Sequence, residues 1–244
     1  RAAWCSNLKL KGFVIMEETD KKIEVNSTEE KMYTKEEAIA AIEQTQIPAE
    51  SFSYTYEDTF MMEDLENRKL YINYQIDKNI NELITYHILR YNAMDKDVKV
   101  KDRNPIKIFI NSEGGSVSDG LSCLSVMKIS KTPIYTISFG YCYSMGFHLF
   151  LGGTRRFASP DSNFMNHSGS ITIEDNTDRV IDGLNFLKKQ AIKNDIFVLE
   201  KTKMTKSDVK KSKRADVYYT SEDAYKLGIA TEIIGKTCDI DEIL

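Results

Sequence analysis

The chain has 244 residues, with 33 Lys and Arg against 37 Asp and Glu, so its formal net charge is −4. Because both signs are dispersed and phosphate binding needs a concentrated positive face, this balance argues against a nucleic-acid-binding protein. The length allows a sizeable core and favours one main α/β domain with an appendage over two small domains. The locally basic segment Lys203–Arg214 is interpreted as a solvated helix and loop rather than a phosphate site.

Cysteine usage and apolar runs indicate the compartment. The four cysteines lie far apart without a C-x-x-C pair, which predicts neither a zinc site nor a disulfide framework and favours a reducing compartment. No run approaches the roughly 18 apolar residues needed to span a bilayer, and the start, R-A-A-W-C-S-N, lacks the apolar core of a signal peptide. We therefore expect a cytoplasmic protein with no membrane partner. The chain does not begin with Met, which leaves open an address removed upstream.

The N-terminal region is predicted to hold a small α+β unit. Two β-prone runs, Lys9–Glu17 and Lys21–Asn26, flank a polar turn and predict a hairpin. A capping-box pattern, T-K-E-E ahead of A-I-A-A-I, predicts a helix from Lys35 to about Gln44. The unit has few large apolar residues, so we expect it to dock on the main domain or on a neighbouring subunit.

The acidic stretch Glu57–Glu66 is interpreted as a linker, and it divides the chain into residues 1–65, an extension with its linker, and residues 66–244, the main domain. In the main domain Leu70–Ile76 reads as a strand, a helical pattern follows, and Ile106–Asn111 reads as the next strand. This succession is a βαβ unit, which implies parallel strands and a right-handed crossover. The predicted apolar face of the helix consists of Ile80, Leu83, Ile84, Ile88 and Tyr91.

A second helix and strand repeat the unit. Ser116 with Asp119 is predicted to cap the helix, and Ile134–Phe139 reads as the following strand. The sheet therefore grows as βαβαβ, with strand ends converging on Gly115 and Ser144, and active sites lie at such strand ends in α/β sheets. The predicted buried stripe of this helix is Val117, Leu121, Leu124 and Met127.

The run G-Y-C-Y-S-M-G places Ser144 where a strand gives way to a helix. Such a tight turn pushes a hydroxyl out of the fold, so Ser144 is the candidate nucleophile. The paired glycines Gly114 and Gly115 close the neighbouring strand. Because glycine adopts positive φ, such a pair leaves free N–H groups that can hold an oxyanion.

A serine hydroxyl needs a general base, and the chain has three histidines. His87 falls on the apolar face of a predicted helix, where packing is its expected role. His148 lies four residues after Ser144 on the same predicted helix, and its ring can lean back toward that serine. His167 follows the short run Asn163–Asn166, where a strand delivers a polar side chain to the site. We therefore favour His167 as the base, with His148 as the alternative.

Candidate acids follow a weaker pattern. Asp216 precedes the short predicted strand Val217–Tyr219, and from the residues alone such an aspartate reads as a turn cap. The competing acids Asp119, Asp161 and Asp223 also have plain roles as cap or turn residues. A helix is predicted to open at Thr220–Glu222 and to end at Gly228.

A long amphipathic helix is predicted from about Asp178 to Lys201, after a Ser- and Thr-containing segment, Ser168–Thr177. A helix of this length cannot be wholly covered by a domain of this size, so its exposed stripe implies a partner surface. Ordinary packing on the same subunit is the alternative. The apolar face comprises Val180, Ile181, Leu184, Leu187, Ile192, Ile196 and Leu199.

Four motifs occur in order: I-N-S-E-G-G-S, G-Y-C-Y-S-M-G, F-M-N-H and A-D-V-Y-Y-T-S-E-D-A-Y-K-L-G-I. Strings like G-x-S-x-G occur by chance, but the four in this order with compatible gaps are specific. From about Lys69 to Ile234 the chain resembles the caseinolytic (ClpP-type) serine peptidases. The resemblance implies that Ser144 is the nucleophile, His167 the base and Asp216 the orienting acid.

The same resemblance implies that Gly115 and Met145 supply the backbone N–H groups of an oxyanion hole. The implied fold is a ClpP/crotonase-like superhelix of repeated βαβ units, with the long helix as a handle between rings. The implied activity is a serine endopeptidase that needs no metal or organic cofactor and cleaves peptides or unfolded proteins inside stacked seven-membered rings. A Clp-type ATPase is the implied partner, since the chain has no phosphate-loop motif of its own.

The chain departs from the family pattern near the nucleophile. Glu113 stands where the family usually has proline, and Cys142 and Tyr143 stand where it has small residues. Ser168 and Gly169 replace a glutamine-proline pair after the histidine. Large or polarisable side chains beside the nucleophile are expected to reshape the pocket for the substrate side chain.

Other readings within the wider superfamily stay open. A crotonase-like acyl-CoA enzyme shares the strand-turn-helix repeats and holds a thioester enolate on paired N–H groups, but it does not need serine, histidine and aspartate in this order. An inactive or structural ring subunit is a further alternative. Within the peptidases, the long extension and altered motifs also suit a phage head-maturation protease.

Overall fold

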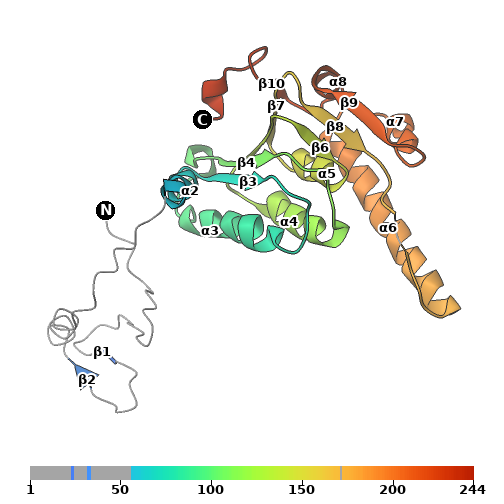
Figure 1. Cartoon of the computed structure of the whole chain (residues 1–244), viewed down its shortest axis with the longest axis horizontal. Helices are drawn as coiled ribbons and strands as arrows, with labels where there is room; N and C mark the ends of the chain where they lie inside the picture. Colours follow the sequence, from blue (N-terminus) through green and yellow to red (C-terminus); the bar gives the residue numbers. More distant parts are fainter. Residues whose placement is uncertain (1–22, 25–31, 34–55, 171) are drawn as a thin grey trace. The chain divides into compact units, whose positions relative to one another are not determined.

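The computed structural model describes residues 23–24, 32–33, 56–170 and 172–244 (Figure 1). The chain divides into two units, Arg1–Thr59 and Phe60–Leu244. In the first unit, β1 (Ile23–Glu24) pairs antiparallel with β2 (Met32–Tyr33).

Strand β1 lies inside one strand of the predicted hairpin, Lys21–Asn26, and its described partner follows it in the chain. The other predicted strand, Lys9–Glu17, and the predicted helix Lys35–Gln44 lie outside the described residues.

The predicted linker Glu57–Glu66 is wrong in form, because it coincides with the helix α2 (Tyr56–Glu66). Met, Leu and Glu are strong helix formers, and these residue types outweigh the acidic, linker-like composition of the stretch. Leu65 packs against the core, and its carbonyl accepts a 2.7 Å hydrogen bond from the Tyr91 hydroxyl. The last turn of α2 is therefore part of the main unit.

Five parallel strands form the central sheet of the main unit in the order β10-β7-β5-β4-β3. They are β3 (Lys69–Ile72), β4 (Ile106–Ile110), β5 (Ile134–Ser138), β7 (Arg155–Ala158) and β10 (Glu232–Ile233). The parallel order confirms the predicted βαβ units. Alternate side chains of β4 are buried, as a period of two requires.

The first crossover helix consists of a π-helical turn, η1 (Asn81–Thr85), continued by α3 (Tyr86–Met94). Four members of its predicted apolar face are buried: Ile80, Ile84, Ile88 and Tyr91. The prediction for Leu83 is wrong, because its side chain is 49% exposed. Leu83 precedes Ile84 directly, so it falls at the margin of a stripe that repeats at about every fourth residue.

The second crossover helix is α4 (Val117–Ile129), and Figure 1 shows it beside α3 over one face of the central sheet. The Ser116 hydroxyl accepts from the Asp119 N–H, which confirms the predicted cap. Leu124 and Met127 are buried and Leu121 packs against them, but Val117 is 48% exposed, contrary to the prediction. Val117 lies in the first turn, which reaches past the core toward Gly169.

A second, three-stranded sheet lies beside the first, in the order β6-β8-β9. Strand β6 (Tyr141–Tyr143) runs parallel to β8 (Asn163–Asn166), and β9 (Val217–Thr220) runs antiparallel to β8. The predicted helix after β9 is α8 (Ser221–Lys226), opened by a capping box at Thr220 and followed by Gly228 at φ +70°. The chain is thus a mixed α/β fold of the predicted class.

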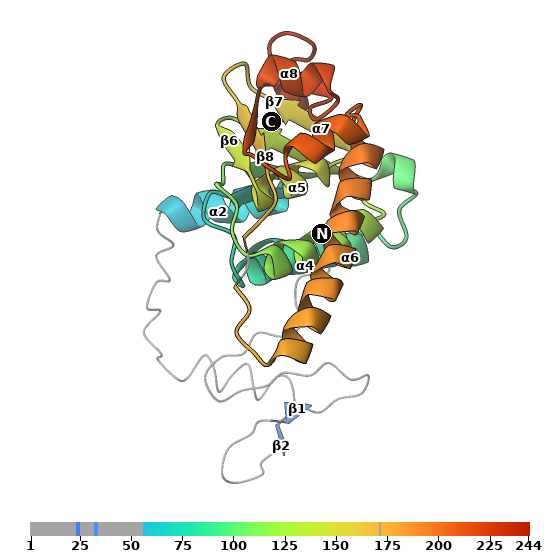
Figure 2. The ribbon, with the colours of Figure 1, turned by 90° about the vertical axis from the view of Figure 1, so that its right-hand side faces the viewer.

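The long helix is α6 (Thr177–Lys201), and the short helix α7 (Lys206–Lys211) follows it. Figures 1 and 2 both show the N-terminal half of α6 extending past the rest of its unit. Phe197 and Val198 near its C-terminus are buried. Large apolar side chains along the helix are exposed in the single chain: Ile181, Leu184, Phe186, Ile192 and Ile196. Among the described helices, none combines the length and hydropathy required to cross a membrane.

Candidate active site

Ser144 occupies the junction between β6 and α5 (Met145–Leu151), with φ +53° and ψ −117°. A non-glycine residue at such angles is strained by about 1–3 kcal/mol and persists only where its surroundings hold it. The Ser144 N–H donates to the Met165 carbonyl at 2.9 Å, which ties the turn to β8. The predicted strand-to-helix turn is therefore present, and the surrounding backbone holds it.

His167 links Ser144 to Asp216. Its Nε2 lies 2.8 Å from Ser144 Oγ, and its Nδ1 lies 2.9 Å from Asp216 Oδ1. Because a carboxylate accepts, Nδ1 carries the hydrogen, and Nε2 is left to accept the serine proton. The His167 side chain is 29% exposed and that of Asp216 is 51% exposed, so solvent reaches the site. Strands β6, β8 and β9 thus bring together the three residues proposed from the sequence.

The competing acids Asp119, Asp161 and Asp223 take part in hydrogen bonds at helix caps and turns. The Asp223 carboxylate accepts from the N–H and the hydroxyl of Thr220 in the capping box of α8. Asp119 lies in the first turn of α4, where its N–H bonds the Ser116 cap. Asp161 precedes β8, and its carbonyl accepts from the Asn163 amide. Each therefore has the cap or turn role expected for it.

The alternative base, His148, does not reach the serine hydroxyl. Its Nδ1 lies 3.1 Å from the Ser144 carbonyl oxygen, and its ring packs edge-on against Phe147. Burial lowers the pKa of His148, and this favours a neutral ring. His87 lies on α3 with a half-buried ring tilted against Tyr91, and burial lowers its pKa as well. Of the three histidines, the structure brings only His167 to Ser144 Oγ.

The paired glycines lie directly against the serine turn. Gly114 has φ +101° and Gly115 φ +145°, and a Cβ on Gly114 would lie 2.8 Å from Ser144 Cβ and 2.9 Å from the Met145 nitrogen. The Gly114 N–H donates to Ser112 Oγ, so it is not free, contrary to the expectation for both glycines. In the described part of the chain, the N–H groups of Gly115 and Met145 donate no hydrogen bond.

Cys142 and Tyr143, which depart from the family pattern, have side chains on opposite faces of β6. Cys142 is fully buried, with its Sγ 3.5 Å from the Ile110 carbonyl, and burial raises the pKa of its thiol to about 12. It therefore faces the core, and the expectation that it shapes a substrate pocket is wrong. Tyr143 is half-buried on the opposite face of β6, where its ring meets Tyr218 edge-on.

Sequence reasoning missed Ser212, which fixes both neighbours of the histidine. Its buried hydroxyl accepts from Asn166 Nδ2 at 3.1 Å, and its carbonyl accepts from the Ser168 N–H at 2.8 Å. Ser212 thereby holds the chain immediately before and after His167. It lies in the lysine-rich stretch that reads as a solvated helix and loop, so no sequence signal pointed to it.

The family model for Clp proteases matches residues 50–237, which is most of the chain. The chain belongs to the Clp protease family. It is 28% identical over 181 residues to the ATP-dependent Clp protease proteolytic subunit 2 of Thermobifida fusca, a match that covers 72% of this chain and 85% of that protein. It is 30% identical over 175 residues to the subunit of the same name from Corynebacterium efficiens, covering 70% and 83%. The predicted family is thereby confirmed, and the chain is homologous to proteolytic subunits of the serine peptidase class.

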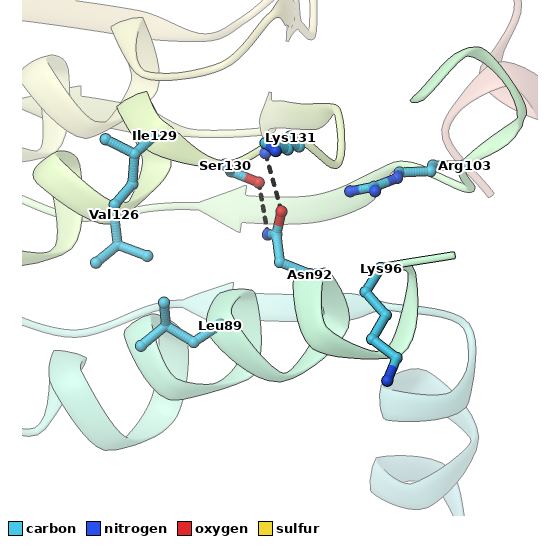
Figure 3. Close-up of a pocket in the computed structure, with 8 residues that line it drawn as sticks. All are labelled: Leu89, Asn92, Lys96, Arg103, Val126, Ile129, Ser130 and Lys131. Carbon is cyan, nitrogen blue, oxygen red and sulfur yellow. Dashed lines mark hydrogen bonds between the residues drawn. The ribbon is translucent and has the colours of Figure 1, made fainter. Parts of the chain in front are cut away.

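A hollow of about 320 Å³ in this Clp-family chain lies between α3 and the end of α4 (Figure 3). Asn92 stands at its centre, donating to the Ser130 hydroxyl and accepting from the Lys131 N–H. These bonds join α3 to the C-terminal end of α4. Its lining includes none of Ser144, His167 and Asp216.

Proposed function

We propose that this chain is a serine endopeptidase that hydrolyses peptide bonds of unfolded polypeptides, with Ser144 as nucleophile, His167 as base and Asp216 as orienting acid. The observation that carries the proposal is the continuous hydrogen-bonded path from the Asp216 carboxylate through both ring nitrogens to Ser144 Oγ. In this proposal residues 66–244 carry the chemistry, and residues 1–65 form an extension.

The geometry supports the following steps. Ser144 Oγ attacks the substrate carbonyl carbon while its proton passes to His167 Nε2, and the Asp216 carboxylate stabilises the imidazolium that forms. The N–H groups of Gly115 and Met145 are free to hold the oxyanion of the tetrahedral intermediate. His167 then protonates the leaving amine, and water releases the acyl group by the same steps. No metal or organic cofactor is needed.

We also propose that the chain works in a ring-shaped oligomer of stacked seven-membered rings. Five large apolar side chains along α6 are about half exposed in the single chain, and covering each would contribute about half of the roughly 1.5–3 kcal/mol of a fully buried side chain. A second copy of the chain would cover them. The relatives carry the words ATP-dependent in their names, and we propose that a Clp-type ATPase feeds unfolded substrate to this chain as well.

Active-site labelling combined with native mass measurement tests the proposal. A fluorophosphonate should label the parent protein at Ser144, and the labelled species should have the mass of a closed multimer. Ser144→Ala should lose labelling and peptide cleavage, with a rate loss of about a million-fold, and should assemble as the parent does. An unlabelled parent, or a Ser144→Ala protein that cleaves peptides at the parent rate, would rule out the serine-peptidase proposal.

A further inference from the structure

The loop between β4 and α4 carries an exposed carboxylate at Glu113, where the family usually has proline. The residues on both sides of Glu113 are buried and hydrogen-bonded. The Ser112 hydroxyl donates to the Tyr74 carbonyl at 2.7 Å, and the Gly114 N–H donates to Ser112 Oγ at 3.1 Å. The backbone at Glu113 is therefore held in place while its side chain extends into solvent.

This loop lies against the turn that presents Ser144. A Cβ on Gly114 would lie 2.8 Å from Ser144 Cβ, and Glu113 directly precedes this glycine. Consecutive Cα atoms are about 3.8 Å apart, so the Glu113 backbone is one such step from the glycine that touches the serine. At physiological salt the screening length is about 8 Å, and a charge at Glu113 therefore acts on side chains that flank a bond held at Ser144.

The same loop offers an open backbone edge to an extended peptide. Ile76 forms a parallel bridge with Gly115. The Ile76 N–H donates to the Gly114 carbonyl at 2.7 Å, and the Ile76 carbonyl accepts from the Ser116 N–H at 2.8 Å. In such a bridge the N–H and carbonyl of Gly115 itself point to the opposite side, and within the described residues they have no hydrogen-bond partner. An extended substrate that pairs with this edge runs alongside Glu113.

The charge on Glu113 is not balanced within the chain. Among the described residues, none forms an ion pair or a hydrogen bond with the Glu113 carboxylate. The Asp216 carboxylate is 51% exposed as well, and its bond to His167 uses one of its two oxygens. The site therefore has a negative field, which attracts a cationic group and repels an anionic one.

We propose that Glu113 selects substrates with a lysine or arginine side chain within two residues of the scissile bond. The inference rests on the proposed peptidase function and adds a charge preference to it. The Glu113 carboxylate forms an ion pair with the substrate cation and repels an acidic side chain at the same place. Proline carries no charge, so this preference belongs to chains that have an acid at this position.

The test uses the full-length protein and matched peptides that carry Lys, norleucine or Glu at one of the two positions on either side of the cleaved bond. Norleucine is an uncharged residue of nearly the shape of lysine, so the Lys-to-norleucine ratio of kcat/KM isolates the effect of the charge. Glu113→Gln removes the charge and keeps the shape, and Glu113→Lys reverses the charge.

Glu66→Gln is the matched control, because Glu66 is also exposed but lies at the opposite end of the central sheet. It ends α2 just before β3 begins, whereas Glu113 follows the carboxyl end of β4, which runs parallel to β3. Fluorophosphonate labelling of Ser144 and native mass are measured for every variant.

At one of these positions the parent should show a Lys-to-norleucine ratio of about three to five, the size of an exposed ion pair. Glu113→Gln should bring that ratio to about one, and Glu113→Lys should turn the preference toward the Glu peptide. Glu66→Gln should keep the parent ratio. Added salt should lower the ratio in the parent, because ions screen an exposed pair.

A Glu113→Gln protein that labels at Ser144 and keeps the parent ratio overturns the role of Glu113 and leaves the peptidase proposal standing. A parent that cleaves peptides without any Lys preference at these positions has the same consequence. A Glu113→Gln protein with an altered native mass assigns the carboxylate to a contact between copies and also overturns the charge preference. A parent that neither labels nor cleaves overturns both proposals.

Discussion

Two regions of the molecule differ in how completely contacts within one chain hold and cover them. One is the sheet β6-β8-β9, which carries Ser144, His167 and Asp216, and the other is the helix α6. In the sheet, strand pairing holds β6, β8 and β9 beside the three residues, and Ser212 bonds Asn166 and Ser168 on either side of His167. Along α6, large apolar side chains such as Leu184 and Ile192 are left in water. Under the proposed function, the three catalytic side chains are therefore positioned within one chain, whereas the exposed side of α6 is expected to be covered by a second copy.

The largest expected effect comes from a substitution in the sheet region. His167→Ala should lower peptide cleavage by about a million-fold, because Ser144 Oγ then has no base. His148→Ala should keep cleavage near the parent rate, since His148 contacts the Ser144 carbonyl rather than its hydroxyl. Steady-state kinetics on one fluorogenic peptide measures both. If His148→Ala is the inactive variant, the base has been assigned to the wrong histidine.

The second prediction concerns substitutions on the exposed apolar face of α6. Leu184→Glu together with Leu187→Glu should split the assembly into smaller rings, because the partly exposed apolar surface of both side chains is lost from the expected interface and replaced by charge. Activity should fall with it, since the segment 168–176 joins His167 directly to α6. Sedimentation velocity and peptide cleavage are measured together.

Lys188→Glu with Lys189→Glu is the control for that experiment, because it places two glutamates on exposed positions of the same helix that are already polar. A folded Leu184→Glu, Leu187→Glu protein that sediments as single rings yet cleaves at the parent rate would show that α6 does not act on the triad.

The third prediction concerns the C-terminal end of α6, where Arg156 of strand β7 in the central sheet donates to the Lys201 carbonyl. The buried guanidinium of Arg156 donates to the carbonyls of Gly153, Lys201, Gly228 and Ile229, and burial lowers its pKa. Arg156→Met leaves these carbonyls without that donor and should lower the free energy of unfolding by about 3–5 kcal/mol. Differential scanning calorimetry of the intact assembly measures the change.

Arg155→Met is the neighbouring control, because Arg155 forms partly exposed ion pairs with Glu232 and Glu242, and such pairs contribute about 0–1 kcal/mol. Equal melting temperatures for the Arg155 and Arg156 variants would show that the buried guanidinium does not hold the C-terminal end of α6 in place.

The strands and turns were predictable where the local sequence carries an apolar pattern or characteristic turn residues. Alternating and continuous apolar runs located β4 and β5, and the turn residues around Ser144 located the junction between β6 and α5. The resemblance, rather than any single residue, singled out Asp216, because an aspartate before a strand has many roles.

Other features depend on contacts that a sequence pattern does not carry. Periodicity gives the spacing of an apolar stripe but not its width, so Leu83 and Val117 were placed inside although they lie at a margin and in a first turn. Composition suggested a linker where packing of Leu65 and the bond from Tyr91 keep α2 helical. Ser212 is distant in sequence from Asn166, and only the folded chain brings them together.

At Ser144, the backbone conformation that exposes the hydroxyl also lowers the stability of the fold. With φ +53° the chain carries strain that every L-residue there would keep and that glycine would release. The sequence that folds most stably is therefore not the one that presents a nucleophile, a trade-off known from other enzyme sites. A serine at this strained position is therefore costly to folding, and under the proposed function the exposed hydroxyl that it supplies offsets that cost.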